Sequence, residues 1–419
     1  MTIFQKLKQK REEKKNRPPE ELTVSNKHIV IRIIAFVVLL AVGISGIVIG
    51  CTYNSTHLES GWQLVECTVG ETSASDFNLY CNFSKSKREN ANEMKTISNY
   101  YTSLCNNSYK LFNDYKDFED LKGIAYVNKN PNTDIQVEES LYNVLKKAND
   151  SNLKSIFYGP IYDTYHNLYI SNSETEAKAL DPYYDVETKN FYIELTNYVN
   201  NPNHIKITLK ENNVVSLDIS DEYLTYCNTN NIKNFISLNY FYNAITLDYI
   251  ADHMISYGIP DFKIYSYDGC YRSHITNAKL DDTYMPYTFY NEHILPEAKI
   301  KFTSSISLVE LKTFPISKKE EGYYYRDTKK FVHHFLDDSG NYKSCLESLI
   351  LYKKGDYSLF DSLIKGSKIF TADTLNVETL KENFSFIYNE ANVIKYNDSE
   401  LVFVELFNQD GITFTKELI

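Results

Sequence analysis

The alternation of apolar and polar positions predicts a chain in which helices and strands are intermingled. Strand-like runs occur at 62–68, 77–83, 205–209 and 214–219. Apolar residues recur at helical spacing over 87–115 and again over 137–148, which predicts two helices. Because both kinds of element occur in both halves of the chain, the predicted fold class is α+β.

A strand, a loop, a helix and a second strand are predicted in immediate succession near the middle of the chain. The apolar run 235–238 is the first strand. A helix follows, with Thr246 as a candidate cap and Gly258 as its end, since glycine tolerates the left-handed conformation there. The second strand, 262–265, leads into the turn pair at 268–269. Ligands commonly bind at the loop ends of such units.

The first 51 residues differ from the rest in charge and hydropathy. Residues 1–32 carry nine Lys or Arg and four Glu, a net charge of +5, which leaves −16 for the remainder of a chain of net charge −11. Residues 33–50 carry no charge and would span about 27 Å as a helix. The basic flank therefore predicts a cytoplasmic segment at 1–32, a membrane anchor or signal segment at 33–51, and an extracellular domain at 52–419 in a protein of the cell membrane.

The tetrapeptide Val48-Ile49-Gly50-Cys51 resembles the lipobox of bacterial lipoproteins, in which the cysteine is lipidated after cleavage. Two alternatives follow: an uncleaved single-pass anchor, or a lipoprotein attached through Cys51. Both place the domain on the outer face of the membrane. The charge of −16 outside the first segment argues against nucleic-acid binding, because it repels phosphate.

Six cysteines follow Cys51, an even number that is compatible with disulfides outside the cell. Cys67 and Cys81 lie on two neighbouring predicted strands and form the first pair to test. The sequence has no C-x-x-C pair, which argues against a cysteine zinc site or a thioredoxin-type centre.

The order of these pieces resembles the ApbE-type FAD:protein FMN transferases. That family has a pattern of roughly D-L-G-G-I-A-K-G-Y-A-x-D, then a helix, then a strand ending N-x-G-G-D. This chain has S-L-N-Y-F-Y-N-A-I-T-L-D at 237–248 and S-Y-D-G at 266–269. The resemblance implies an ApbE-like fold, with Asp248, Asp268 and Gly269 bordering a flavin cofactor. It covers about 77–419.

The resemblance also implies an activity, the transfer of FMN from FAD to a Thr or Ser of a partner protein with magnesium. This chain departs from the pattern where the phosphates are expected. Asn239 and Tyr240 replace two glycines, and Asn243 replaces a lysine. Glycines let backbone amides approach a phosphate closely, and these side chains would fill that space.

Two further motifs agree with the family in position. His334-Phe335-Leu336-Asp337-Asp338-Ser339-Gly340 stands where the family has about H-I-I-D-P-x-T-G. By this resemblance His334 is the candidate base and Asp337 a second catalytic candidate. Gly159-Pro160-Ile161-Tyr162-Asp163-Thr164 stands where the family has a G-x-F-D-P-type turn, and it keeps the acid at Asp163.

The third motif concerns magnesium. Ala372-Asp373-Thr374-Leu375-Asn376-Val377 resembles the family's A-D-A-L-x-T-A, whose acid and threonine supply metal ligands. Asp373 is therefore the candidate magnesium ligand, but Val377 at the threonine position offers no oxygen to a hard cation. The alternative role of Asp373 is to cap a helix over 374–380.

Three functions remain open from the sequence. The leading hypothesis is a surface-anchored ApbE-like domain with lost or weakened FMN transfer, which acts as a binding or assembly module for flavinylated or membrane redox proteins. The second is an active magnesium-dependent transferase that uses FAD. The third is an unrelated surface adhesin, suggested by 36 tyrosines and an acidic domain.

Overall fold

The computed structural model describes residues 36–40, 57–68, 72–317, 320–409 and 411–419. Contacts divide the chain into residues 1–58 and residues 59–419, and all the sheets lie in the second unit. The predicted segment 33–51, including Cys51, lies outside the described residues except for a helical stretch at 36–40. Among the residues that are described, no helix combines the length and the apolar character needed to cross a bilayer.

Within the described residues, nine strands form one large sheet in the order β1-β2-β6-β7-β12-β15-β16-β17-β19. Neighbouring strands are antiparallel except for the parallel pair β17 and β19. The strands are β1 Gly61–Val65, β2 Phe77–Phe83, β6 Asp261–Ser266, β7 Cys270–Ile275, β12 Ile306–Lys312, β15 Ser348–Lys354, β16 Ser385–Glu390, β17 Val393–Tyr396 and β19 Thr415–Leu418.

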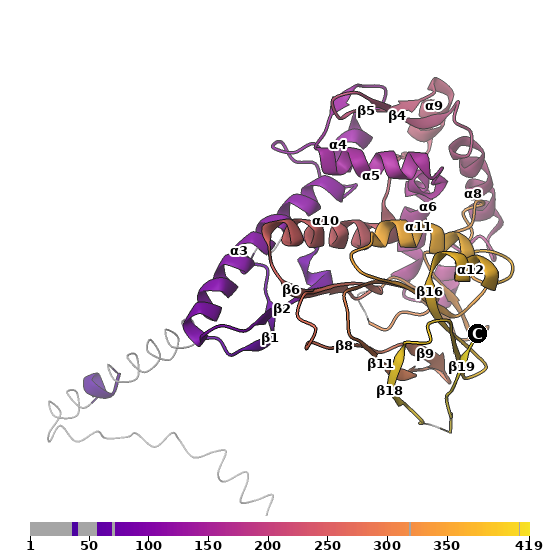
Figure 1. The fold of residues 1–419 in the computed structure, drawn as a ribbon. Helices are drawn as coiled ribbons and strands as arrows, with labels where there is room; N and C mark the ends of the chain where they lie inside the picture. The colour runs from indigo at the N-terminus through magenta and orange to yellow at the C-terminus, as the bar shows by residue number, and fades with distance from the viewer. Residues whose placement is uncertain (1–35, 41–56, 69–71, 318–319, 410) are drawn as a thin grey trace, which may run out of the picture. The chain divides into compact units, whose positions relative to one another are not determined.

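Helices cover one face of this sheet. Figure 1 shows α10 and α11 directly above the strands, with most of the other helices stacked above them. The α-helices are α3 Lys87–Phe112, α4 Ile124–Lys129, α5 Glu139–Asp150, α6 Gly159–Tyr169, α7 Glu174–Lys178, α8 Val186–Val199, α9 Asp221–Thr229, α10 Tyr242–Tyr257, α11 Leu359–Phe370 and α12 Val377–Asn383. Short 3-10 helices are η1 Ser73–Asp76, η2 Lys154–Phe157 and η3 Asn239–Phe241.

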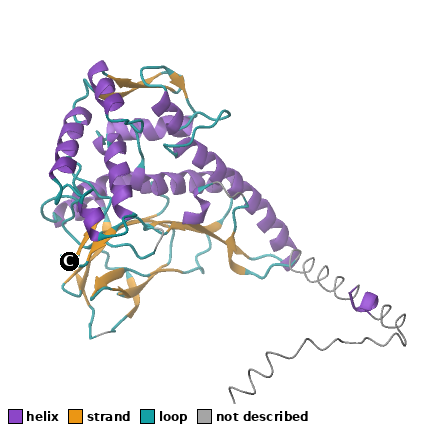
Figure 2. Ribbon diagram, turned by 180° about the vertical axis from the view of Figure 1, so that it is seen from behind, coloured by secondary structure: helices purple, strands orange, loops and turns teal. Residues whose placement is uncertain are grey.

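Small sheets complete the domain: Figure 2 shows strands on the side of the large sheet away from most helices, and Figure 1 shows β4 and β5 beside α9, beyond the helices. A cluster of buried apolar side chains, including Ile300, Leu308 and Ile350, joins β11 to the large sheet. The small sheets consist of β8 Asp282–Tyr284, β11 Ala298–Phe302 and β18 Val402–Leu406; β9 Tyr287–Tyr290 and β10 His293–Pro296; β13 Tyr323–Tyr325 and β14 Lys330–Val332; and β3 Ile135–Gln136, β5 Val214–Ile219 and β4 Ile205–Lys210.

The predicted strand at 235–238 is wrong. Instead of pairing with a strand, its backbone binds the side chain of Asn128: Ile236 donates its N–H to Asn128 Oδ1 at 2.8 Å, and Asn128 Nδ2 donates to the Ile236 carbonyl at 2.8 Å. Ser237 then donates to the carbonyl of Ile156. The buried apolar side chains of this segment resemble those of a strand, but the Asn128 side chain takes the place of the hydrogen bonds to a neighbouring strand.

The predictions that Thr246 and Asp373 cap helices are both wrong, because each helix begins at another residue. Helix α10 begins at Tyr242, directly after η3, so Thr246 is a buried residue inside it. Helix α12 begins at Val377, and Asn376 caps it by accepting the Thr379 N–H. Gly258, with φ of +88°, ends α10 in the left-handed conformation as predicted.

The motif at 159–164 forms the first turns of helix α6 rather than an isolated turn. Pro160 is accommodated there because the first helical positions need no N–H donor. Gly159 is required by close approach: a Cβ at this position would lie 2.3 Å from the Asn234 carbonyl oxygen. The motif therefore fixes α6 against the segment that precedes 235–238.

The cysteine pair proposed from the sequence is not formed, because Cys81 carries no disulfide. Cys81 is buried within β2, whereas Cys67 lies beyond the end of β1 and close to Cys105 of α3. A hydrogen bond with Cys67 and burial raise the pKa of the Cys105 thiol.

Glu297, between β10 and β11, gives the fold a measurable pH dependence. It is 3% exposed, and burial raises its pKa to about 7, although Asn389 Nδ2 donates to Oε1 at 2.5 Å. A carboxyl whose pKa is higher in the folded state lowers stability as pH rises from about 4.5 through 7. We expect the stabilisation by Glu297→Gln to be about 1–3 kcal/mol larger at pH 8 than at pH 5.

Urea denaturation at both pH values measures this difference. The matched control is Glu378→Gln, because the Glu378 side chain is 81% exposed and its loss should change stability equally at both pH values. Equal effects of Glu297→Gln at pH 5 and pH 8 would mean that burial does not raise the pKa of Glu297 above its unfolded value.

Candidate functional site

Segments from the sequence motifs, except the motif at 372–377, meet around one cavity of about 470 Å³. Residues 237–243, with η3 and the start of α10, form one wall, and the β6–β7 turn at 267–268 adjoins it. The end of α3 with residues 113–115, the first half of α6, residues 320–321 and His334 complete the lining. This size lies within the range of small-molecule sites.

The lining of this cavity is strongly acidic. Among the described residues it includes no lysine and no arginine. Six carboxylates and two histidines line it: Asp76, Asp114, Asp163, Asp268, Glu320, Glu321, His166 and His334. Such a lining attracts cations and repels phosphate groups.

Two of these carboxylates lie within 4 Å of a lysine or histidine nitrogen among the described residues. Glu320 accepts from buried Lys312 Nζ at 2.9 Å, and Glu321 lies 3.0 Å from His166 Nδ1. Within the described residues, Asp114 and Asp268 have no lysine or arginine nitrogen within 4 Å of their oxygens. The negative charge of the cavity is therefore only partly balanced.

His334 lies half-buried between this cavity and the residues around Lys312. Its ring stacks on Tyr240, with centroids 5.5 Å apart and planes inclined by 16°. Burial, with a smaller effect of Lys312, lowers the pKa of His334 to about 3. The imidazole is therefore neutral at physiological pH and only a weak base, in a wall formed by aromatic rings.

Asp268 and Gly269 form the turn between β6 and β7. Asp268 Oδ2 accepts from Asn243 Nδ2 at 2.8 Å, and Oδ1 accepts from the Ser266 hydroxyl. Thus Asn243, which stands where the resemblance expects a lysine, binds a carboxylate of the same chain. Gly269 has φ of +102°, and its carbonyl accepts the Glu310 N–H at 2.9 Å.

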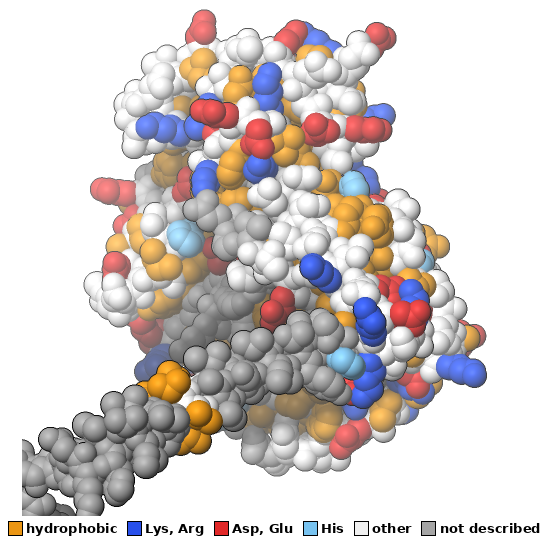
Figure 3. All heavy atoms as spheres, turned by 90° about the vertical axis from the view of Figure 1, so that its left-hand side faces the viewer, with side chains coloured by type: hydrophobic (Ala, Val, Ile, Leu, Met, Phe, Trp, Pro, Cys, Tyr) orange, Lys and Arg blue, Asp and Glu red, His pale blue; other side chains and the backbone are white. Residues whose placement is uncertain are grey.

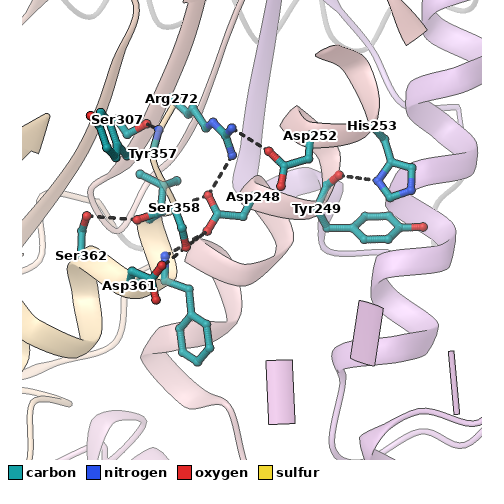
Figure 4. Close-up of polar contacts among 12 residues, drawn as sticks. Asp248, Tyr249, Asp252, His253, Arg272, Ser307, Tyr357, Ser358, Asp361 and Ser362 are labelled. Atoms are coloured by element: carbon teal, nitrogen blue, oxygen red, sulfur yellow. Dashed lines mark hydrogen bonds and ion pairs between the residues drawn. The ribbon is translucent and has the colours of Figure 1, made fainter. Parts of the chain in front are cut away.

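Asp248 does not line this cavity but forms the centre of the network in Figure 4, with a side chain that is 13% exposed. Its carboxylate accepts from Arg272 Nη1 at 3.1 Å and from the Ser358 hydroxyl at 2.8 Å. It also accepts the N–H groups of Leu359 and Phe360 at 2.9 and 3.0 Å, and so stabilises the N-terminus of α11. Burial raises the pKa of Asp248, and Arg272 opposes that effect.

The remaining candidate residues lie apart from the cavity. The side chain of Asp373 is 91% exposed and accepts from Lys343 Nζ at 2.6 Å, which lowers its pKa. Asp337 accepts the N–H groups of Ser339 and Asn341, so it stabilises its own turn. Across the described residues, no group of three or more His, Cys, Asp or Glu side chains is arranged to hold a metal ion.

FAD and magnesium do not fit the residues at this site. The positions where the resemblance expects phosphate contacts carry the Asn239 and Tyr240 side chains, and Tyr240 is buried against His334. Nearby carboxylates would repel a pyrophosphate, and Asp373 already binds Lys343. The site therefore offers an acidic cavity with aromatic walls rather than a phosphate cradle.

His334 and Asp268, both named from the sequence, line this cavity, but much of the rest of its lining was not anticipated. Asp114, Glu320 and Glu321 come from loops whose positions depend on contacts distant in sequence. Two of the six lining carboxylates were named from the sequence: Asp163, the acid kept in the 159–164 motif, and Asp268.

Comparison with known proteins supports the architecture. No family model and no curated protein matches the chain. Among solved structures, it is similar to the ApbE protein of Thermotoga maritima, with 11% identity and a TM-score of 0.51, covering 79% of this chain and 94% of that chain. It is similar to the flavin transferase ApbE of Vibrio cholerae, with 12% identity, a TM-score of 0.51 and the same two coverages. The chain therefore has an ApbE-like fold.

Proposed function

We propose that this protein is a ligand-binding module built on an ApbE-like fold, with FMN transfer lost or greatly weakened. The observation that supports the proposal is the acidic cavity, because a site for FAD must accept a pyrophosphate. Tethered to the outer face of the membrane, the domain would bind a partner linked to flavin or redox proteins.

The second candidate is an active, divergent transferase. It is favoured by the position of His334 and Asp268 in the same cavity. In that case His334 would take the proton of an acceptor hydroxyl, although its lowered pKa makes it a weak base, and Asp268 would border the flavin. This candidate gains no support from Asp373, which is exposed and paired with Lys343.

One experiment separates the two candidates. The purified full-length chain is incubated with FAD, Mg²⁺ and a flavin-acceptor domain, then separated by denaturing electrophoresis. We expect no covalent flavin fluorescence in the acceptor, and no change in the FAD absorbance spectrum on mixing with the chain. An authentic transferase treated identically serves as the positive control.

Covalent fluorescence that disappears in His334→Ala would contradict the proposal and establish the transferase. Fluorescence that persists in His334→Ala would still show transfer, but would place the base elsewhere. The same gel for Asp373→Ala tests whether that exposed carboxylate contributes.

A further inference from the structure

The cavity differs from the rest of the surface in its charge. Figure 3 shows acidic and basic side chains interspersed over the described part of the face it presents. In the cavity, by contrast, six carboxylates gather without a lysine or arginine among the described lining residues. Such a concentration of one sign in a hollow focuses the field on an oppositely charged ligand.

The hydrogen bonds of the acidic wall leave room for another donor. Asp114 and Asp163 share a single amide, since Asn234 Nδ2 lies 3.3 Å from an oxygen of each. A carboxylate has about four acceptor positions. Two carboxylates bound by one neutral donor can therefore accept further N–H donors from a ligand.

The aromatic part of the wall suits an organic cation. Seven aromatic residues line the cavity: Tyr109, Phe112, Tyr115, Tyr162, Tyr240, Tyr242 and Tyr267. Elsewhere the chain places its own ammonium groups over rings, with Lys263 Nζ 5.0 Å from the Trp62 centroid and Lys178 Nζ 5.0 Å from that of Tyr184. Ammonium groups over aromatic rings are attracted by the ring quadrupole.

An independent observation also points to a ligand. The hydroxyl of Tyr162, a residue of the cavity lining that is 5% exposed, has no partner in hydrogen-bond geometry among the described residues, although the Ser155 side chain lies close to it. Buried polar groups are nearly always paired, so an unpaired hydroxyl beside a cavity indicates a missing partner.

A metal ion is a poorer match than an extended cation. No group of three or more carboxylates or histidines in the described residues converges as ligands. The acids instead come from α6, the end of α3, the β6–β7 turn and residues 320–321, around the cavity. This distribution favours a ligand with positive charges separated along a flexible chain.

We infer that the cavity binds an organic cation bearing alkylammonium groups, either a free polyamine or the lysine side chains of a partner protein. This inference rests on the proposed function, since the same cavity cannot hold FAD and such a cation together. The aromatic walls hold the methylene groups, and the carboxylates accept the N–H donors.

Isothermal titration calorimetry on the full-length chain tests the inference, with spermidine as the free cation and a lysine-rich peptide as the tethered one. We expect spermidine to bind and the affinity to fall as salt rises. Asp114→Asn should weaken binding about tenfold. The control Glu400→Gln removes an 80% exposed carboxylate outside the cavity and should leave affinity unchanged. Thermal melting confirms that both variants fold.

The titrations distinguish the two possible sources of the cation, and they distinguish failure of the inference from failure of the proposed function. Binding of the peptide alone assigns the cation to a protein partner, and binding of spermidine alone assigns it to a free polyamine. Equal affinity of wild type and Asp114→Asn overturns the inference, as does tighter binding of Mg²⁺ that displaces spermidine. Binding of FAD overturns the proposed function, whereas absence of both FAD and cation binding overturns only the inference.

Lys318 and Lys319 precede the acidic wall in sequence and lie outside the described residues. The double variant Lys318→Ser, Lys319→Ser therefore completes the test. It should bind spermidine as well as wild type does. Spermidine binding that appears only in this variant would mean that the chain supplies its own cation, and would overturn the inference.

Discussion

Replacing Asp248 with alanine is expected to destabilise the protein by about 3–5 kcal/mol. The change removes the less exposed of the two carboxylate partners of Arg272, whose side chain is only 4% exposed, and leaves a buried cation poorly compensated. It also removes an acceptor for the backbone N–H groups of Leu359 and Phe360 at the start of α11. Urea denaturation of the full-length chain measures the loss.

The matched control is Asp252→Ala. Asp252 binds the other nitrogen of Arg272 at 2.6 Å, but its side chain is 64% exposed, so its loss should cost at most about 1 kcal/mol. Asp248→Asn separates the two roles, because it keeps an oxygen for the helix and loses the charge. Equal effects of Asp248→Ala and Asp252→Ala would show that the buried network contributes little to stability.

Replacing Gly269 with alanine is expected to destabilise the protein by about 2–4 kcal/mol. Its φ of +102° disfavours any side chain, and a Cβ would lie 2.7 Å from the Glu310 carbonyl oxygen and 2.9 Å from Glu310 Cβ. The turn would have to move, which would displace Asp268 from the cavity wall. The melting temperature and the affinity for spermidine should therefore both fall.

Gly258→Ala provides the control for this prediction. Gly258 also has positive φ, at +88°, but no atom lies within 4 Å of a Cβ there. Its replacement should cost only the conformational strain, about 1 kcal/mol. If the free energy of unfolding falls by the same amount in both alanine variants, the close contact with Glu310 does not contribute to the loss of stability.

The sequence predicted elements best where local pattern and burial agree. Strand β2 was predicted at 77–83 with the bounds that the structure has, because its residues alternate between buried and half-buried positions. Strand β5 was likewise predicted at 214–219. The segment 235–238 failed because one side chain, Asn128, satisfies its backbone from a distance in sequence.

Of the candidate site residues named from the sequence, His334 and Asp268 line the cavity, whereas Asp248, Asp337 and Asp373 do not. The motifs brought His334 and Asp268 to one cavity, and they indicated that Tyr240 would occupy the space of a phosphate. Asp114 and Glu321 were missed, since nothing local marks a loop acid as part of a shared wall. Charge at a site depends on which loops meet, and that is set by tertiary packing.

The order of strands in the large sheet has a consequence for how the protein folds. Strand β2 pairs with β6, so that Phe77 lies opposite Ser266, and the helices from α3 to α10 are formed from the chain between them. Loop closure of this length precedes any gain from pairing, which makes such topologies slow to fold. During synthesis the edge of β2 that pairs with β6 keeps its backbone N–H and C=O groups unpaired until residue 261 has emerged. A chaperone that shields this edge until then should raise the yield of native protein.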